Sequence, residues 1–179
     1  MFAQLLISSA VAALPLLAKT ALAADCARTY TVVEGDICDS ISAANNASTY
    51  QLAAVNSGTI DSTCSNLAIG SSICLGTVGE DCQTTYVVQE GDTCDQIASA
   101  HGINTTILYT NNPNIDDACS NIYIGEVLCV SDSVLVPPIP SSGIPATTIP
   151  ATAANPTQTA NFVSQDDEDD EDLPWCDEL

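Results

Sequence analysis

Basic side chains are almost absent from this chain. Its 179 residues include two Lys and Arg residues against 23 Asp and Glu residues, and the formal net charge is -21. Proteins bind nucleic acids and anionic membrane surfaces through clustered Lys and Arg side chains, so the composition excludes both kinds of partner. We therefore expect a ligand that is neutral or cationic.

Histidine and aromatic residues are also scarce. The sequence has one histidine, His101, and an aromatic content of 4%. A single histidine beside scattered carboxylates does not provide a nucleophile, a base and an orienting group. We predict that the protein is not an enzyme and has neither catalytic residues nor a cofactor. The low aromatic content also argues against a binding site built on stacked aromatic rings.

Cysteine, by contrast, is plentiful, and the cysteines repeat. Two sets of four share nearly the same spacing: Cys26, Cys38, Cys64 and Cys74, then Cys82, Cys94, Cys119 and Cys129. The words between them repeat as well, since TYTVVEGDICDSI returns as TYVVQEGDTCDQI and CSNLAIGSSIC returns as CSNIYIGEVLC. This predicts two copies of one small module, at residues 26–76 and 82–130, with no separate catalytic domain.

The eight repeated cysteines predict disulfide bonds in an oxidising compartment. Zinc is the alternative, but zinc sites favour closely spaced cysteines or mixtures of Cys and His. Within each repeat at least nine residues separate successive cysteines, so we expect no metal site. Two disulfides, each worth on the order of 2–4 kcal/mol, compensate for the small core of so short a module. Four cysteines allow three pairings, of which the nested one suits an antiparallel hairpin of the two strands.

Residues 1–23 have the pattern of a secretory signal peptide. An almost wholly apolar run is followed by Ala21-Leu22-Ala23, which has the small–x–small form of a cleavage site. The run is interrupted by Pro15 and is too short to span a bilayer comfortably, which argues against a membrane anchor. We predict a secreted protein, extracellular or associated with the cell wall, with no membrane contact after signal cleavage.

Each module is predicted to fold as strand, helix, helix and strand, so the fold class is α+β. Asp36 and Asp92 follow a glycine at the end of the first strand, where the N-cap of a helix is expected. Ser48 and Asn104 are predicted to cap the second helices, and Ser48 with Gln51 has the form of a capping box.

The composition changes after the second module. Residues 131–161 are rich in Pro, Thr, Ser and Ala without periodicity, which predicts an extended, O-glycosylated stalk. An acidic run follows at 166–172. Cys176 is the odd cysteine, which either pairs with a second chain or stays free. We predict that the whole of 131–179 is disordered.

The repeated residues resemble a known family. The pattern YTVVEGD-x-C-x-x-I…N…L-x-I-G-x-x-I-C is similar to the LysM carbohydrate-binding module, in its cysteine-rich form from secreted fungal proteins. The resemblance implies a two-stranded antiparallel sheet with two helices on one face. It also implies a ligand, which is chitin or another polymer of N-acetylglucosamine. Tandem modules without an enzymatic domain resemble secreted effectors with which fungi hide chitin fragments from host receptors.

In the family, contacts to the sugar come from the loop after the first strand and the loop before the last. Carried over by position, the resemblance implies these ligand-binding residues: Gly35, Asp36, Ile37, Asn56, Ser57 and Ile60, then Gly91, Asp92, Thr93, Asn112, Pro113, Asn114 and Ile115. For the two aspartates, capping is the interpretation that we favour over direct sugar contact. The second copy follows the family pattern more closely, so we expect it to bind more tightly, or the first to bind differently.

Two N-glycosylation sequons occupy aligned positions in the repeats. They begin at Asn46 and Asn104, and both predict a glycan that leaves the sugar groove free. The alternative is coincidence, because Asn and Thr also suit the turn between two helices.

Together these features predict a secreted, non-catalytic protein that binds chitin oligomers. It would sequester chitin fragments from host immune receptors or shield hyphae from chitinases. Two joined sites can clamp one sugar chain or bridge two, so the sequence allows a ligand-bridged dimer or a Cys176-linked one. Two alternatives remain open: a wall protein anchored on its producer's own chitin, and a disulfide-rich inhibitor or toxin with a protein target.

Overall fold

The structure, a computed structural model, describes residues 25–145. The predicted signal peptide, the acidic run and Cys176 all lie outside the described residues. Within residues 25–145, no helix combines the length and the apolar character needed to cross a membrane.

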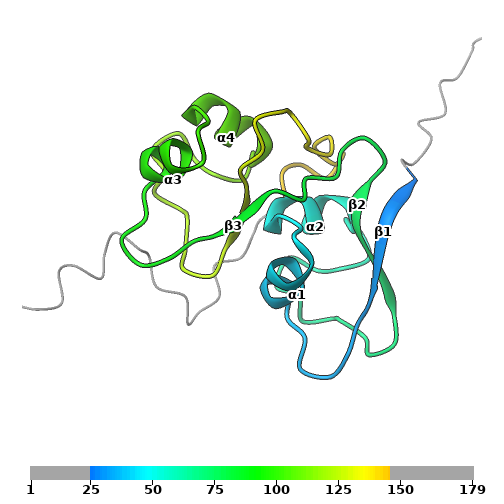
Figure 1. Cartoon of the computed structure of the whole chain (residues 1–179). Coiled ribbons are helices and arrows are strands. Elements are labelled where there is room, and N and C mark those ends of the chain that lie inside the picture. Colours follow the sequence, from blue (N-terminus) through cyan, green and yellow to red (C-terminus); the bar gives the residue numbers. More distant parts are fainter. Residues whose placement is uncertain (1–24, 146–179) are drawn as a thin grey trace, which may run out of the picture.

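Each repeat folds as a strand, two helices and a strand, which confirms the predicted fold class (Figure 1). The first module contains β1 (Cys26–Thr31), α1 (Cys38–Asn45), α2 (Thr49–Val55) and β2 (Ser72–Thr77). The second contains β3 (Thr85–Val87), α3 (Cys94–Ala100), α4 (Thr105–Asn111) and β4 (Val127–Cys129). The two modules lie side by side in Figure 1, the first running from blue through cyan to green and the second from green toward yellow.

An antiparallel strand pair closes each module. β1 pairs with β2 starting from Cys26 opposite Thr77, and β3 pairs with β4 starting from Thr85 opposite Cys129. Because these strands come from the two ends of a module, they bring its first and last cysteines together. The disulfides are accordingly nested: Cys26–Cys74 and Cys38–Cys64 in the first module, Cys82–Cys129 and Cys94–Cys119 in the second.

The first helix of each module begins one residue later than predicted. The residues before α1 and α3 with extended backbone are Ile37 and Thr93, and Thr93 caps its helix through its hydroxyl. Asp36 and Asp92 instead accept the backbone N–H three residues earlier in the chain, at 2.8 and 2.6 Å. The N-cap prediction for both aspartates is therefore wrong, because each carboxylate turns back to close the loop between strand and helix.

The second helices are capped as predicted. Ser48 accepts the backbone N–H of Gln51 at 3.1 Å, and Asn104 accepts that of Ile107 at 2.8 Å. A capping side chain of this kind stabilises a helix by about 1 kcal/mol. The Gln51 side chain does not complete a capping box, however, because it is buried and bonds to other parts of the chain.

Each module has its own apolar core between its helices and its strand pair. In the first module the core includes Val32, Ile41, Leu52, Ile73 and Leu75. In the second it includes Val88, Ile97, Leu108, Ile122 and Leu128. Each fully buried leucine contributes roughly 1.5–3 kcal/mol, so both cores are small and depend on their disulfides.

Polar contacts around Gln51 fasten the two modules together. Its amide donates to the carbonyl of Leu75 at 2.6 Å and to Asp81 at 2.9 Å, and its oxygen accepts the N–H of Cys82 at 2.9 Å. Arg28 forms an ion pair with Asp81 at 2.7 Å, and this partner holds the pKa of the Asp81 carboxyl below its usual range. The linker between the modules is therefore fixed to the first module.

Residues 131–145 follow a defined path, although we had predicted disorder from residue 131 onward. The amide of Asn111, at the end of α4, donates to the carbonyl of Ser133 at 2.9 Å and accepts the N–H of Leu135 at 2.9 Å. The segment has no regular secondary structure and is held by contacts from α4. Its own composition therefore did not predict this path. The rest of the predicted disordered tail, 146–179, lies outside the described residues.

Candidate functional site

The first module is hollowed between its two loops. The cavity has a volume of about 480 Å³, which lies within the ordinary range of small-molecule sites. Its lining includes Ile37 from the β1–α1 loop, and Ser57 and Ile60 from the α2–β2 loop. These are three of the six positions that the LysM resemblance implied in this module, so the structure brings both predicted loops to one cavity.

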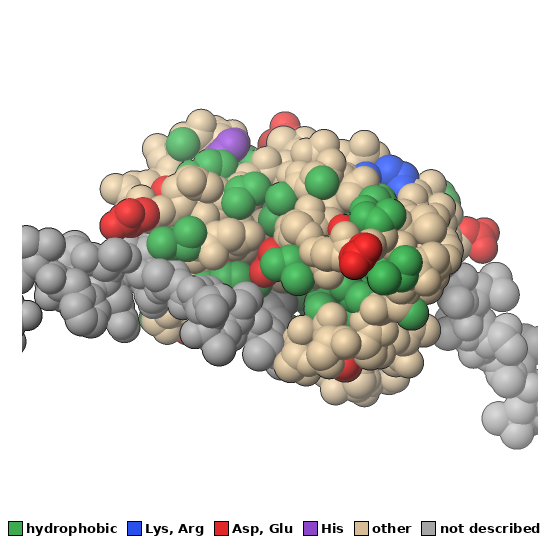
Figure 2. Space-filling view, turned by 90° about the horizontal axis from the view of Figure 1, so that it is seen from below, with side chains coloured by type: hydrophobic (Ala, Val, Ile, Leu, Met, Phe, Trp, Pro, Cys, Tyr) green, Lys and Arg blue, Asp and Glu red, His purple; other side chains and the backbone are tan. Residues whose placement is uncertain are grey.

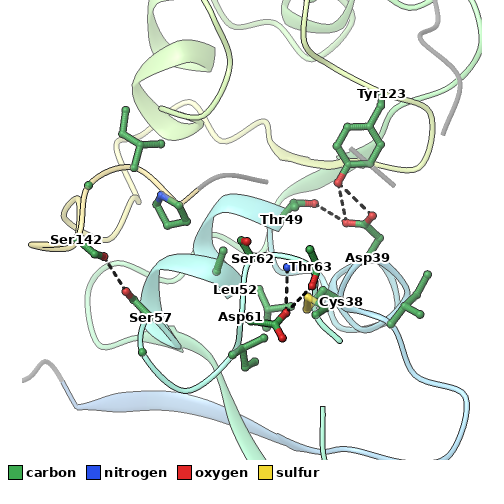
Figure 3. Close-up of a pocket in the computed structure, with 18 residues that line it drawn as sticks. Cys38, Asp39, Thr49, Leu52, Ser57, Asp61, Ser62, Thr63, Tyr123 and Ser142 are labelled. Carbon is green, nitrogen blue, oxygen red and sulfur yellow. Dashed lines mark hydrogen bonds between the residues drawn. A yellow bond between two sulfur atoms is a disulfide. The ribbon is translucent and has the colours of Figure 1, made fainter. Parts of the chain in front are cut away.

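The lining combines hydroxyl groups with apolar side chains. Leu52 of α2 and Ile60 provide apolar surface, while Ser57, Ser62 and Thr63 carry hydroxyls. Figure 3 shows Ser62 and Thr63 beside the half-cystine Cys38, on the side of the cavity across from Ser142. Such a mixture suits a neutral ligand that has both polar groups and a small apolar face.

Asp61 holds the loop that carries Ser62 and Thr63. Its carboxylate accepts the N–H and hydroxyl of Thr63, at 3.0 and 2.9 Å, and those of Ser65, at 2.9 and 2.6 Å. These hydrogen bonds, with the Ser65 hydroxyl foremost, lower the pKa of Asp61 to about 2. The carboxylate therefore stays charged at neutral and mildly acidic pH, and the loop keeps its shape.

The second module contributes Tyr123 to the cavity wall. The Tyr123 hydroxyl lies 3.1 Å from each carboxylate oxygen of Asp39 on α1 and donates a hydrogen bond to this carboxylate (Figure 3). Thr49 donates to the same carboxylate at 3.1 Å. Burial raises the pKa of Asp39 and that of Tyr123, so the tyrosine hydroxyl remains a donor. These bonds lock the two modules together at the edge of the cavity.

Four residues from beyond β4 complete the lining. They are Ser142, Gly143, Ile144 and Pro145. The hydroxyls of Ser142 and Ser57 lie 3.1 Å apart (Figure 3). A segment that we had predicted to be structureless therefore touches one of the predicted ligand-binding residues.

The other three implied positions in the first module shape its loops. Gly35 has a φ of +88°, which glycine adopts without strain. Asp36 closes the same turn, as described above. The buried Asn56 side chain donates to the carbonyls of Leu52 and Cys74, at 2.7 Å each, and accepts the N–H of Cys74 at 2.9 Å. Its amide is therefore occupied by the fold, and none of the three lines the cavity.

The implied positions in the second module are Gly91, Asp92, Thr93, Asn112, Pro113, Asn114 and Ile115, and none of them lines this cavity. Asn112 bonds to both backbone groups of Cys129 at 2.8 Å, Asn114 donates to Glu126 at 2.6 Å, and Ile115 is buried in the core. That these residues bind a ligand stays a prediction. This cavity lies on the first module; that the second module binds more tightly, or the first differently, stays a prediction as well.

Asp61 and Tyr123 were missed by the sequence analysis. For Asp61 a signal was present, because DSTCSN at 61–66 returns as DDACSN at 116–121. Asp116 likewise accepts the N–H of Ser120 at 2.8 Å and that of Ala118 at 3.1 Å. For Tyr123 no local pattern exists, since its partner Asp39 belongs to the other module.

The two sequon asparagines are exposed and lie outside the cavity lining. Asn104 uses its side-chain oxygen to cap α4, which leaves its nitrogen for a glycan. Glycosylation at Asn46 and Asn104 stays a prediction. Within the part of the chain that the structure describes, no cluster of three or more His, Cys, Asp or Glu side chains is placed to hold a metal ion.

Comparison with known proteins agrees with the fold and with the repeated motif. The model of the LysM domain matches residues 30–76 and 86–131, which is one match for each module. The chain belongs to the LysM family. Both of its LysM domains contain the loops described above, so the two loops that line the module 1 cavity lie within a matched domain.

The relatives of this LysM chain are mostly fungal. It is 34% identical over 121 residues to the non-secreted LysM effector LCP1 of Gibberella moniliformis, covering 66% of this chain and 16% of the relative. It is 30% identical over 132 residues to the secreted LysM effector LysM1 of Trichophyton rubrum, covering 61% of this chain and 52% of the relative. A probable peptidoglycan-N-acetylglucosamine deacetylase of Arthroderma benhamiae is 40% identical over 53 residues, which cover 30% of this chain and 12% of that protein. The chain thus spans at most about half of the length of these relatives.

Proposed function

We propose that the protein binds chitin oligomers, or other polymers of N-acetylglucosamine, without cleaving them. The observation that carries this proposal is the cavity at the two loops of the first LysM module. A lectin needs a preformed groove with hydroxyl partners and an apolar contact, and this cavity offers both. The LysM effectors among its relatives support the same assignment.

The chemistry of the cavity fits an N-acetyl sugar. Its acetamide has a donor, an acceptor and a methyl group, which match the loop backbone, the hydroxyls and the isoleucines. Ile37 is 57% exposed, so a ligand can bury much of this side chain when it binds. Burying each additional CH₂ group contributes roughly 0.8 kcal/mol, so a few methyl contacts are enough for moderate affinity.

The charge distribution supports a neutral ligand. Arg28 is the one basic side chain among residues 25–145, and it is paired with Asp81. The face shown in Figure 2 carries separate acidic side chains with apolar ones between them, and a single small basic spot. A neutral sugar pays no electrostatic penalty on such a surface, whereas an anionic polymer would be repelled.

We place the site of action outside the cell. Four disulfides require an oxidising compartment, which supports secretion. The named relatives include both secreted and non-secreted effectors, so the location is tested directly by fractionating cultures of the producing organism. Protein in the culture fluid supports sequestration of chitin fragments, whereas tight retention in the wall supports the structural alternative.

Calorimetric titration of the full chain with a chitin tetramer tests the binding itself. We expect saturable heat, together with retention of the protein on insoluble chitin but not on cellulose. Binding to peptidoglycan instead of chitin would mean that the preferred polymer is a different one, while the class of ligand would stay the same. The absence of binding to any polymer of N-acetylglucosamine would refute the proposal and direct attention to a protein target.

A matched pair of variants tests the location of the site. Ile37 and Val33 are both exposed apolar residues near the same loop, but only Ile37 lines the cavity. We expect Ile37→Ala to weaken binding about fivefold, since it removes roughly 1 kcal/mol of apolar contact. Val33→Ala should leave the affinity unchanged. Equal effects of the two substitutions would show that the ligand does not bind in this cavity.

A further inference from the structure

The segment Pro140–Pro145, called here the strap, lies against the first module although it follows the second in sequence. It belongs to the stretch drawn in yellow and orange in Figure 1, which leaves β4 and crosses toward α2. Its last four residues line the module 1 cavity, together with the two LysM loops. The cavity therefore has a wall that belongs to neither LysM repeat.

Definite contacts lead the chain to this position. Asn111 of α4 holds the residues that precede the strap, through the bonds to Ser133 and Leu135 given above. The buried Tyr50 of α2 donates its hydroxyl to the carbonyl of Pro137, which is itself buried, at 3.3 Å. Two anchors, one on each module, thus deliver the strap to the cavity.

A tight turn then aims the end of the strap at the cavity. The N–H of Gly143 donates to the carbonyl of Pro140 at 2.9 Å, and Gly143 has a φ of +100°. Only glycine adopts this backbone conformation readily, so the turn depends on that residue. The turn places the Ser142 hydroxyl 3.1 Å from that of Ser57 and sets Ile144 and Pro145 on the cavity.

The cavity remains open with the strap in position. With Ser142–Pro145 as part of its lining the cavity still has a volume of about 480 Å³, and Ile144 is 50% exposed. A ligand of ordinary size can therefore enter without displacing the strap. This favours a wall of the site over a cover that blocks it.

We propose that the strap is a third wall of the sugar site on the first module, with Ser142 and Ile144 in contact with the bound N-acetylglucosamine polymer. This inference rests on the proposed function. Ser142 and Ser57 together present paired hydroxyls to the sugar, and Ile144 faces the apolar part of the ligand together with the loop isoleucines. Among residues 25–145 the strap lines the cavity of the first module, so we expect the tighter site there, whereas the sequence had predicted tighter binding by the second module or a different mode of binding by the first.

Two nearby isoleucines, one in the strap and one directly before it, provide the test. Ile144 and Ile139 are exposed to 50% and 53%, but only Ile144 lines the cavity. In the full chain, we expect Ile144→Ala to weaken binding of a chitin tetramer about fivefold and Ile139→Ala to leave it unchanged. Both variants should keep the thermal midpoint of the wild type, because neither side chain belongs to a core.

A second measurement observes the contact directly. With isoleucine methyl groups labelled for NMR, saturation with the tetramer should shift the signals of Ile144, Ile37 and Ile60 and leave that of Ile139 in place. Tighter binding by Ile144→Ala would mean that the strap covers the site, and an unchanged affinity would mean that it takes no part; either result overturns the proposal. If wild type and both variants all fail to bind the tetramer, the proposed function fails, and the strap site fails with it.

Discussion

Replacing Glu126 with glutamine should stabilise the protein above neutral pH and remove most of the pH dependence of its stability between pH 5 and pH 8. Glu126 precedes β4 and is 1% exposed. Its carboxylate accepts the amide of Asn114 at 2.6 Å and the N–H of Tyr123 at 3.4 Å. Burial, opposed by these hydrogen bonds and reinforced by the nearby charge of Asp39, raises its pKa from 4.5 to about 7.

The sign follows from proton binding. Between pH 4.5 and about 7 the folded protein holds a proton on Glu126 that the unfolded chain has lost, so the free energy of unfolding falls as pH rises through this window. A pKa change of this size corresponds to roughly 3 kcal/mol, because each tenfold change in protonation is worth about 1.4 kcal/mol. The full penalty applies above the folded-state pKa and disappears below the unfolded-state value.

Glutamine at this position is neutral and keeps a carbonyl oxygen for Asn114. It loses the long contact with the Tyr123 N–H, which costs about 1 kcal/mol. The variant should therefore be more stable than the wild type by about 2 kcal/mol at pH 8 and within about 0.5 kcal/mol of it at pH 5, where part of the penalty already applies. The difference between these two effects, about 2.5 kcal/mol, does not depend on the lost contact.

Urea denaturation followed by circular dichroism, with the disulfides intact, measures both values. Glu90→Gln is the matched control, because Glu90 lies in the β3–α3 loop of the same module and is exposed. The control should change stability by less than about 0.5 kcal/mol at either pH. If Glu126→Gln has the same effect at pH 5 and pH 8, then Glu126 does not titrate in this window and the reasoning from its burial is refuted.

Two further substitutions test the buried amides. Gln51→Met keeps the shape of the side chain but leaves the N–H of Cys82 and a β2 carbonyl without partners, so urea denaturation should show that the free energy of unfolding falls by about 2–4 kcal/mol. Gln83→Met, an exposed control, should lower it by less than about 0.5 kcal/mol. Equal losses would contradict the role of Gln51 in joining the two modules. Asn112→Ala removes the bonds to both backbone groups of Cys129 and should cost about 2–4 kcal/mol, whereas a loss below about 1 kcal/mol would mean that water replaces the amide.

The sequence was sufficient for whatever is local or repeated. Cysteine spacing identified the modules. Pairing of the first and last strands of each module favoured nested disulfides, and the disulfides are nested. The caps at Ser48 and Asn104 were predictable because a capping side chain bonds within its own first turn. The Asp36 and Asp92 error was also local. A carboxylate beside glycine can close the preceding turn or cap the following helix, and composition does not decide between them.

The sequence was not sufficient for contacts between distant segments. Tyr123 and Asp39 are 84 residues apart, and Ser57 and Ser142 are 85 apart. Neither pair produces a periodic pattern, and a stretch rich in Pro and Ser has the same composition whether or not another element anchors it. Residues of both pairs line the cavity, so sequence reasoning located its loops but not the walls that distant segments supply.

Comparing equivalent residues of the two modules shows how the second module contributes to the cavity on the first. Tyr123 occupies the position of Ala68 in the other copy; Ala68 is exposed, whereas Tyr123 is buried against the first module. Asp39 and Asp95 are also equivalent, but only Asp39 accepts a hydrogen bond from Tyr123, and Asp95 is exposed. Equivalent residues of the two modules therefore make different contacts, because the modules pack against each other asymmetrically. The second module therefore supplies part of the cavity of the first, and which of the two modules binds a ligand more tightly stays a prediction.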